Sequence, residues 1–236
     1  MNWERQRLDL LHTMKRLDKL GMVSGSSGNA SVKLSQSENK EENREKNNTG
    51  QLYLVTPAGI SYDRLEAADM VVVNHDLETI DDDCKGEGEG IPSSESLLHI
   101  AAYDARPDVS AVIHTHSVYA TVQAVKAEPI PPIIDEMVVY IGGQVEVSEY
   151  GFPGSQELAD NSLRALGERR AALIRNHGMF AVGPGLSEAL RIAELVERVA
   201  KIYVHAQMTG GAVALPENAV AAEKGIYRMR TGFRGN

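Results

Sequence analysis

The chain has 236 residues, of which 42% are hydrophobic and 24% charged. These values are ordinary for one soluble globular domain and exclude a disordered, collagenous or coiled-coil chain. Its formal net charge is −9 and its basic residues form no cluster, which argues against a nucleic-acid partner. Because only 5% of the residues are aromatic, the core must consist mainly of aliphatic side chains, which favours an α/β fold.

The location of the protein can be predicted from two features. The single cysteine, Cys84, cannot form an internal disulfide, and the N-terminus lacks the continuous apolar stretch of a signal peptide. No segment approaches the roughly 20 apolar residues that span a membrane. We therefore expect a cytoplasmic protein with no membrane partner.

The N-terminal third begins with a predicted helix. Apolar residues recur with a period near 3.6 over residues 8–20, and Gly21 can end that helix. A tight loop rich in Gly and Ser follows at residues 24–29. The polar residues 35–50 predict an exposed hairpin extension. The strands expected here are residues 30–34 and 51–56.

The rest of the chain alternates between extended and helical patterns. Further strands are expected at residues 70–74, 109–115, 138–141, 145–147, 171–174 and 179–182. Further helices are expected at residues 97–105, 117–125, 155–169 and 187–208. Ser93 or Ser94 is expected to cap the helix at residues 97–105, with Glu95 in its first turn. No repeat or linker divides the chain, which predicts a single domain over residues 1–236.

Two histidines end a buried strand. His114 and His116 flank Thr115, and residues two apart on a strand point to the same face, so both imidazoles can reach one metal ion. The apolar residues that precede them imply that the imidazoles need a polar partner. The alternative is that both histidines have a structural, hydrogen-bonded role.

A third histidine and a carboxylate complete the candidate site. His177 lies in a turn between two apolar runs, and three imidazoles can hold a catalytic zinc with an open position. Glu95, near a helix N-terminus, is either a favourable charge against the helix dipole or a metal ligand and proton carrier. His99, one helical turn after Glu95, is expected to be a packed residue.

Three loops carry groups that suit a phosphate, although each can also be a plain turn. Gly28 and Asn29 end a loop that can present backbone N–H groups to an anion. Ala58 and Gly59 form a second turn. Ser93 and Ser94 precede a helix, where hydroxyls and free N–H groups favour an anion.

Read in order, five segments resemble those of the class II aldolase/adducin family, over about residues 5 to 230. They are Gly28-Asn29-Ala30-Ser31, Thr56-Pro57-Ala58-Gly59-Ile60, Pro92-Ser93-Ser94-Glu95, His114-Thr115-His116 and Asn176-His177-Gly178-Met179. The resemblance implies a three-layer α/β/α domain with a mostly antiparallel central sheet. It also implies a homotetramer with active sites at subunit interfaces, and one divalent metal ion per subunit, usually Zn²⁺.

The resemblance also implies roles for individual residues. His114, His116 and His177 would bind the metal, and Glu95 would be both a ligand and the catalytic acid/base. The substrate phosphate would lie against Gly28, Asn29, Ala58, Gly59, Ser93 and Ser94. Tyr227 resembles a C-terminal tyrosine that closes over the site. The implied activity is reversible cleavage of a short ketose 1-phosphate, such as L-fuculose 1-phosphate, to dihydroxyacetone phosphate and an aldehyde through a metal-bound enediolate.

Two departures leave other reactions open. Ala58 stands where aldolases of the family have a hydroxyl residue, which removes one hydrogen bond to phosphate. Asp135 or Glu136 falls where those aldolases place a tyrosine that reaches into the neighbouring subunit's site. A carboxylate there is similar to the ribulose-phosphate 4-epimerases and methylthioribulose-1-phosphate dehydratases of the family, unless it is only an exposed acidic turn. A non-catalytic scaffold of the adducin kind is disfavoured, since it would lack the ligands.

Overall fold

The protein is described by a computed structural model, which covers residues 3–35, 50–80 and 90–232. Its centre is a six-stranded sheet in which every pair of neighbouring strands is antiparallel, in the order β3-β2-β1-β4-β6-β5. The strands are β1 (Asn29–Lys33), β2 (Tyr53–Val55), β3 (Val71–Val73), β4 (Ala111–Thr115), β5 (Ala171–Ile174) and β6 (Gly178–Gly183).

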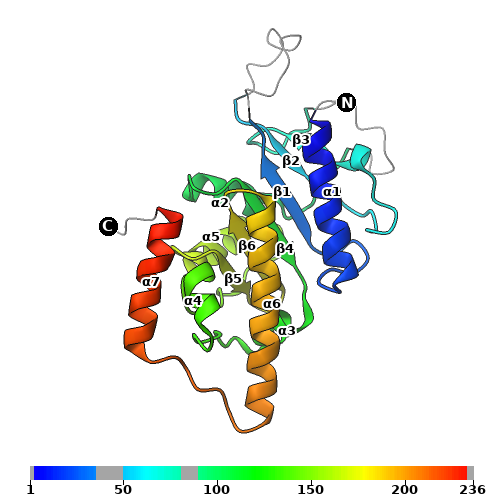
Figure 1. Cartoon of the computed structure of the whole chain (residues 1–236). Helices are drawn as coiled ribbons and strands as arrows, with labels where there is room; N and C mark the ends of the chain where they lie inside the picture. Colours follow the sequence, from blue (N-terminus) through cyan, green and yellow to red (C-terminus); the bar gives the residue numbers. More distant parts are fainter. Residues whose placement is uncertain (1–2, 36–49, 81–89, 233–236) are drawn as a thin grey trace.

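Helices cover both faces of this sheet (Figure 1). The helices are α1 (Glu4–Lys19), α2 (Ser96–Ala105), α3 (Val118–Lys126), α4 (Asp135–Ile141), α5 (Gln156–Leu166), α6 (Leu186–Met208) and α7 (Glu217–Thr231), with a short 3₁₀ helix η3 (Ala67–Asp69). Helices α1, α3 and α6 pack on one face of the sheet, and α2 and α5 pack on the other. The expected three-layer α/β/α domain with an antiparallel sheet is confirmed.

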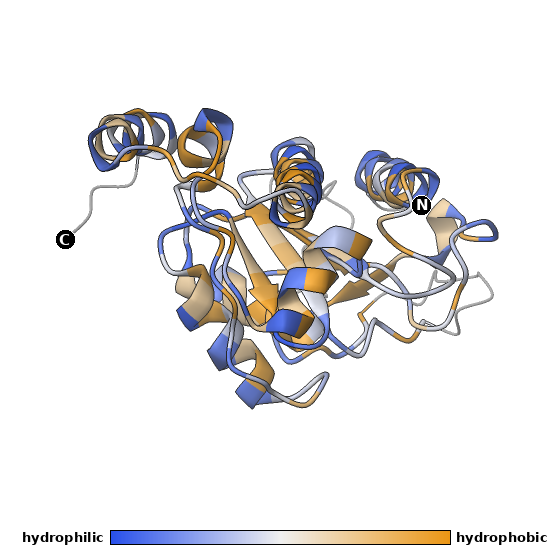
Figure 2. Cartoon of the chain, turned by 90° about the horizontal axis from the view of Figure 1, so that it is seen from below, coloured by the Kyte–Doolittle hydropathy of each residue, from blue (hydrophilic) through white to orange (hydrophobic). Residues whose placement is uncertain are grey.

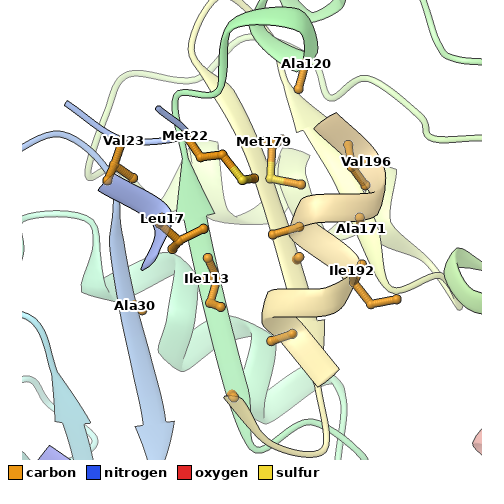
Figure 3. Packing of buried hydrophobic residues seen from close by; sticks show 14 of the residues in the cluster. Leu17, Met22, Val23, Ala30, Ile113, Ala120, Ala171, Met179, Ile192 and Val196 are labelled. Atoms are coloured by element: carbon orange, nitrogen blue, oxygen red, sulfur yellow. The ribbon is translucent and has the colours of Figure 1, made fainter. Parts of the chain in front are cut away.

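Strand residues alternate between two hydrophobic clusters, as the two-residue period of a strand requires. In β4, Ile113 faces α1 and α6, whereas Val112 faces α2 and α5. Figure 2 shows the apolar strands enclosed between the helical layers. In Figure 3, Ile113 and Met179 lie between Leu17 of α1 and Ile192 of α6. His114 follows Val112 on the same face, so β4 directs it into the layer that it shares with α2.

Two segments differ from the expected pattern. Residues 138–141 are helical rather than extended, because α4 has acidic residues in its first turn, ends at Gly142 with φ +105° and buries Met137, Val138 and Ile141. Residues 145–147 make only isolated bridges, from Val145 to Ile130 and from Val147 to Leu173. Tertiary packing thus overrides the strand preference of a β-branched run.

The ends of the chain also differ. Helix α7 was not anticipated from the pattern, and Tyr227 is its buried residue. The hairpin extension expected over residues 35–50 falls mostly outside the described residues, as does Cys84. Among the helices that the structure describes, none is long and apolar enough to cross a membrane.

Candidate metal centre and phosphate loops

Four side chains converge where strands β4 and β6 meet the start of α2. Glu95 is the residue before α2, His114 lies in β4, His116 follows that strand, and His177 occupies the turn between β5 and β6. One ligand atom from each lies within 4.8 Å of all the others. The structure therefore brings together the four residues that the sequence analysis selected as metal ligands.

The ligand atoms point toward a common centre. The Nε2 atom of His114 lies 3.2 Å from Glu95 Oε2, and the Nε2 atom of His177 lies 3.1 Å from Glu95 Oε1. His114 Nε2 and His116 Nε2 are 2.9 Å apart. Each pair of imidazole centroids is separated by 4.8 Å, with interplanar angles of 68° to 71°. Three rings arranged like propeller blades with their Nε2 atoms inward match the geometry of a three-histidine metal site.

The backbone fixes which nitrogen of His114 faces this centre. Its Nδ1 lies 2.9 Å from the carbonyl oxygen of Met179 on the neighbouring strand, and a carbonyl only accepts. The proton therefore lies on Nδ1, and the lone pair of Nε2 is free to bind a metal. A partner of this kind holds the imidazole in the orientation that ligation requires.

The protonation states also suit a cation. Burial alone would raise the pKa of Glu95, but its hydrogen bond to His114 and the charges of the three histidines hold that pKa at about 2. Burial lowers the pKa of His116 to about 4, with His114 and His177 acting in the same direction. Burial and the neighbouring His114 lower the pKa of His177, against the charge of Glu95. One carboxylate and three imidazole nitrogens form a donor set that fits Zn²⁺.

Two glycines allow the ligand-bearing strands to approach. Gly28 has φ +76°, and a Cβ at this position would lie 2.8 Å from the carbonyl oxygen of His114. A Cβ on Gly178 would lie 2.3 Å from the carbonyl oxygen of Thr115. Both contacts are with backbone atoms that a side chain cannot displace cheaply.

The three candidate phosphate loops lie next to one another. Thr56 links the first two, since its hydroxyl accepts from the Ala30 amide at 3.2 Å and its amide donates to the Ala30 carbonyl at 3.0 Å. The Ser93 amide donates to the Thr56 carbonyl at 3.1 Å, which adds the third loop. Asn29 Nδ2 donates to Glu95 Oε2 at 3.0 Å and joins the loops to the metal centre.

Details of the second and third loops differ from the sequence analysis. The Ala58 amide donates to the carbonyl of Ile91 at 2.9 Å, so this N–H group is already occupied. Neither Ser93 nor Ser94 caps α2: the helix begins at Ser96, with Glu95 at the N-cap and no side-chain cap. Instead, the Ser93 carbonyl accepts from the Ser96 amide and hydroxyl, at 3.1 and 2.7 Å.

The other residues selected from the sequence lie elsewhere in this chain. The Tyr227 hydroxyl donates to the Glu168 carbonyl at 2.6 Å, beside Gly142. Glu136, in the first turn of α4, forms an ion pair with Arg198 of α6. Asp135 hydrogen-bonds Glu223, whose pKa is raised by desolvation and by that bond. Within one chain, none of these three belongs to the metal centre, so their implied roles stay predictions.

His99 is buried, as expected, and its Nδ1 lies 2.7 Å from Ser31 Oγ. Neither this contact nor the hydrogen bond between Asn29 and Glu95 follows from the sequence motifs. Both join β1 to the region around the start of α2. One sequence signal could have indicated both contacts. Asn29 and Ser31 are two residues apart along β1, and Glu95 and His99 are four residues apart at the start of α2.

Comparisons with known proteins agree with this geometry. The chain is 31% identical over 215 residues to 5-deoxy-D-ribulose 1-phosphate aldolase of Bacillus thuringiensis serovar kurstaki, covering 91% of this chain and 92% of that protein. It is 34% identical over 195 residues to 5-methylthioribulose-1-phosphate/5-deoxyribulose-1-phosphate aldolase of Escherichia coli O45:K1, covering 83% and 81%.

A solved structure of L-fuculose 1-phosphate aldolase superposes with a TM-score of 0.80 at 34% sequence identity, covering 94% of this chain and 95% of that one. The family model for the class II aldolase and adducin N-terminal domain matches residues 8–204. These matches confirm the resemblance that the five sequence motifs carried. The chain belongs to the class II aldolase and adducin N-terminal domain family.

Proposed function

We propose that this chain is a zinc-dependent aldolase that reversibly cleaves a short ketose 1-phosphate to dihydroxyacetone phosphate and an aldehyde. The observation that carries the proposal is the hydrogen bond from Asn29 to Glu95, which joins the phosphate loops to a four-ligand metal centre. The relatives above are named for aldolases of 5-deoxyribulose, methylthioribulose and fuculose 1-phosphates. These substrates share a ketose carbon chain that ends in a phosphate.

The histidines and Glu95 would hold one zinc ion per subunit. When bound, zinc supplies a Lewis acid for the negative charge that develops on the substrate oxygens during cleavage. Met179 orients His114 for this role, and His177 lies in the turn between β5 and β6 with its ring centroid 4.8 Å from that of His114. No lysine is required to form a Schiff base.

Glu95 is the group proposed to move the proton. Its carboxylate is ionised at neutral pH, since its pKa is about 2 despite burial. Once substrate occupies the site, this carboxylate can accept or return a proton at the carbon next to the substrate carbonyl. Asn29 holds Oε2 of Glu95, so the proton carrier is oriented by the same loop that faces the phosphate.

The phosphate would lie between Gly28, Asn29, Gly59, Ser93 and Ser94. These loops converge near the start of α2, where the helix dipole favours a negative charge. The Ala58 amide, which donates to Ile91, is proposed to shape this loop rather than to bind phosphate.

We also propose that the protein is a cytoplasmic homotetramer whose active sites lie at the interfaces between subunits. Tyr227, Asp135 and Glu136 lie outside the metal centre of their own chain, so the roles implied for them require a second copy. Helix α3 supports such an interface, since Val118, Val122 and Val125 form an apolar stripe with exposed fractions of 61%, 38% and 57%. If Asp135 or Glu136 reaches a neighbouring site, the alternative reactions are 4-epimerisation of a ribulose phosphate and dehydration of methylthioribulose 1-phosphate.

Proton exchange at the hydroxymethyl carbon of dihydroxyacetone phosphate tests the proposal without a choice of aldehyde. Protein loaded with zinc should exchange this proton for deuterium in heavy water, as followed by NMR, and a chelator should stop the exchange. Glu95→Gln should lower the exchange rate by about 10²- to 10⁴-fold. Glu78→Gln, a change at an exposed glutamate bonded to Asn74, is the matched control and should exchange normally. No exchange by fully loaded wild-type protein would contradict the aldolase proposal and favour the two alternatives.

A further inference from the structure

A chain of buried polar side chains lies behind the metal centre, between β1 and α2. The hydroxyls of Ser31 and Tyr103 are 2.7 Å apart, and Ser31 Oγ is 2.7 Å from His99 Nδ1. All three residues are at most 3% exposed. A buried polar group lowers the stability of the folded protein unless it has a hydrogen-bond partner.

The hydrogen-bonding roles along this chain can be assigned. A backbone hydrogen bond from Val112 reaches the Tyr103 hydroxyl, which leaves the Tyr103 proton for Ser31. Ser31 then gives its own proton to Nδ1 of His99. Burial lowers the pKa of His99 to about 3, so its ring is neutral and the remaining proton lies on Nε2.

Two atoms in this layer have no partner within the described chain. His99 Nε2 is a buried donor without an acceptor, and Asn29 Oδ1 is a buried acceptor without a donor. Asn29 and Ser31 lie two residues apart on β1 and so face the same layer. Glu95 and His99 are one helical turn apart and meet Asn29 and Ser31, respectively.

The orientation of the Asn29 amide follows from its neighbour. Its Nδ2 lies 3.0 Å from Glu95 Oε2, and this carboxylate oxygen accepts the hydrogen bond. Oδ1 is therefore directed away from Glu95. A donor to Oδ1 would prevent the amide from turning over, and Nε2 of His99 has the free proton that is needed.

We propose that His99 is a positioning residue whose Nε2–H group holds Asn29 Oδ1, directly or through one buried water, and thereby keeps Asn29 Nδ2 on the metal ligand Glu95. The continuous chain then runs from Tyr103 through Ser31, His99 and Asn29 to Glu95. The proposal rests on the proposed function only in taking Glu95 as a metal ligand. Loss of a group that orients a ligand typically weakens metal binding by about 10- to 100-fold.

Two amide substitutions separate the nitrogens of His99. The amide oxygen of asparagine can occupy the place of Nδ1, which accepts from Ser31, and the amide nitrogen of glutamine can occupy the place of Nε2, which donates. Apoprotein is titrated with Co²⁺ alone, and its affinity and visible spectrum are recorded. We expect His99→Asn to weaken Co²⁺ binding by about 10- to 100-fold and to alter the spectrum, and His99→Gln to restore most of both.

A double-mutant cycle shows whether His99 acts through Asn29. Asn29→Ala should weaken Co²⁺ binding as His99→Asn does, and the double variant should be no weaker than Asn29→Ala alone. Leu98→Ala, at a buried residue of α2 in the adjacent hydrophobic cluster, is the control: it should lower the unfolding temperature but leave Co²⁺ affinity unchanged.

The results distinguish the two proposals. Equal Co²⁺ affinities for His99→Asn and His99→Gln, or additive effects in the cycle, would overturn the role of His99 while wild-type binding still supports the metal centre. Absence of Co²⁺ binding by the wild-type protein would overturn the metal centre itself.

Discussion

Two polar clusters lie at opposite ends of strand β4, and they differ in the groups that surround their charged side chains. Past the C-terminal end of β4, the metal centre gathers one carboxylate and three imidazoles whose Nε2 atoms face one another. Before the N-terminal end, Asp108 pairs with Arg106 at 2.8 Å and with Arg170 at 2.9 Å. Arg106 also donates to the carbonyls of Gly167 and Arg169.

The Asp108 cluster is structural, whereas Glu95 and the three histidines form the candidate functional cluster. The arginines and Asp108 pair their charges inside the chain, although Arg170 Nη1 meets Asp108 as an ion pair without a hydrogen bond. The metal centre places four metal-binding atoms together and leaves Nδ1 of His177 and Oδ1 of Asn29 without partners. Burial alone does not distinguish the two clusters; the difference is that one pairs opposite charges, whereas the other gathers four atoms that can bind one metal ion.

The largest effect should come from breaking the structural cluster. Asp108→Asn leaves two buried guanidinium groups short of a counter-charge, and we expect the free energy of unfolding to fall by roughly 2–4 kcal/mol. Urea unfolding followed by circular dichroism measures this loss. Zinc affinity should not change, and Asp160→Asn, at an exposed carboxylate, is the control. A weaker metal centre in Asp108→Asn would show that the two ends of β4 are coupled.

A smaller effect should distinguish the clusters by pH. Burial lowers the pKa of His99 from near 6.5 to about 3. Below pH 6.5, His99 is therefore protonated in the unfolded chain but stays neutral in the folded chain. Stability should fall as the pH falls, by about 1.4 kcal/mol per unit from His99. Glu95 also makes the folded protein less stable as the pH falls, but only below pH 4.5, the ordinary pKa of a glutamate.

The measurement is urea unfolding of the apoprotein at pH 7 and pH 5, with wild type and His99→Asn compared. We expect the wild type to lose roughly 2 kcal/mol more than the variant over this interval. Equal losses would mean that His99 takes up a proton in the folded protein. Asp108→Asn should keep the wild-type pH dependence, because its defect lies in the other cluster.

The smallest effect concerns Tyr227, which packs beside the structural cluster. Burial raises its pKa, while Arg170 and Arg106 act in the opposite direction. Tyr227→Phe removes the hydrogen bonds of the hydroxyl with the Glu168 carbonyl and with Arg106 but keeps the ring, so the free energy of unfolding should fall by about 1 kcal/mol. A fall in turnover well beyond this loss of stability would place the hydroxyl at a neighbouring active site, as the family resemblance implies.

Much of this architecture could be predicted from sequence because the relevant signals are local. The buried strands near His114 and Phe180 are short apolar runs, and α6 has a helical period over its whole length. The four candidate metal ligands can be selected from residue types, position relative to strands and the family motifs. Their convergence could not come from periodicity, since it depends on how β4 and β6 pair and on where α2 begins.

The errors have physical causes that act over longer distances. The run Val138-Val139-Tyr140-Ile141 has a strong strand preference, but packing on α6 and α7 makes it a helix. Helix α7 buries little apart from Tyr227 and so lacks a clear apolar stripe, although Glu217 and Gly232 mark its ends. The Ser93 cap was wrong because the backbone before Glu95 forms a turn closed by Ser96.

The close approach at Gly28 and Gly178 limits how this catalyst can be redesigned. Any side chain at either position meets a carbonyl oxygen of residue 114 or 115 at 2.8 Å or less, which would push a neighbouring segment away from the strand that carries His114. A randomised library at these two positions should return almost only glycine among active clones. Diversity aimed at new substrates is better spent on Ala58, where the surface is partly open and the backbone already has its partner.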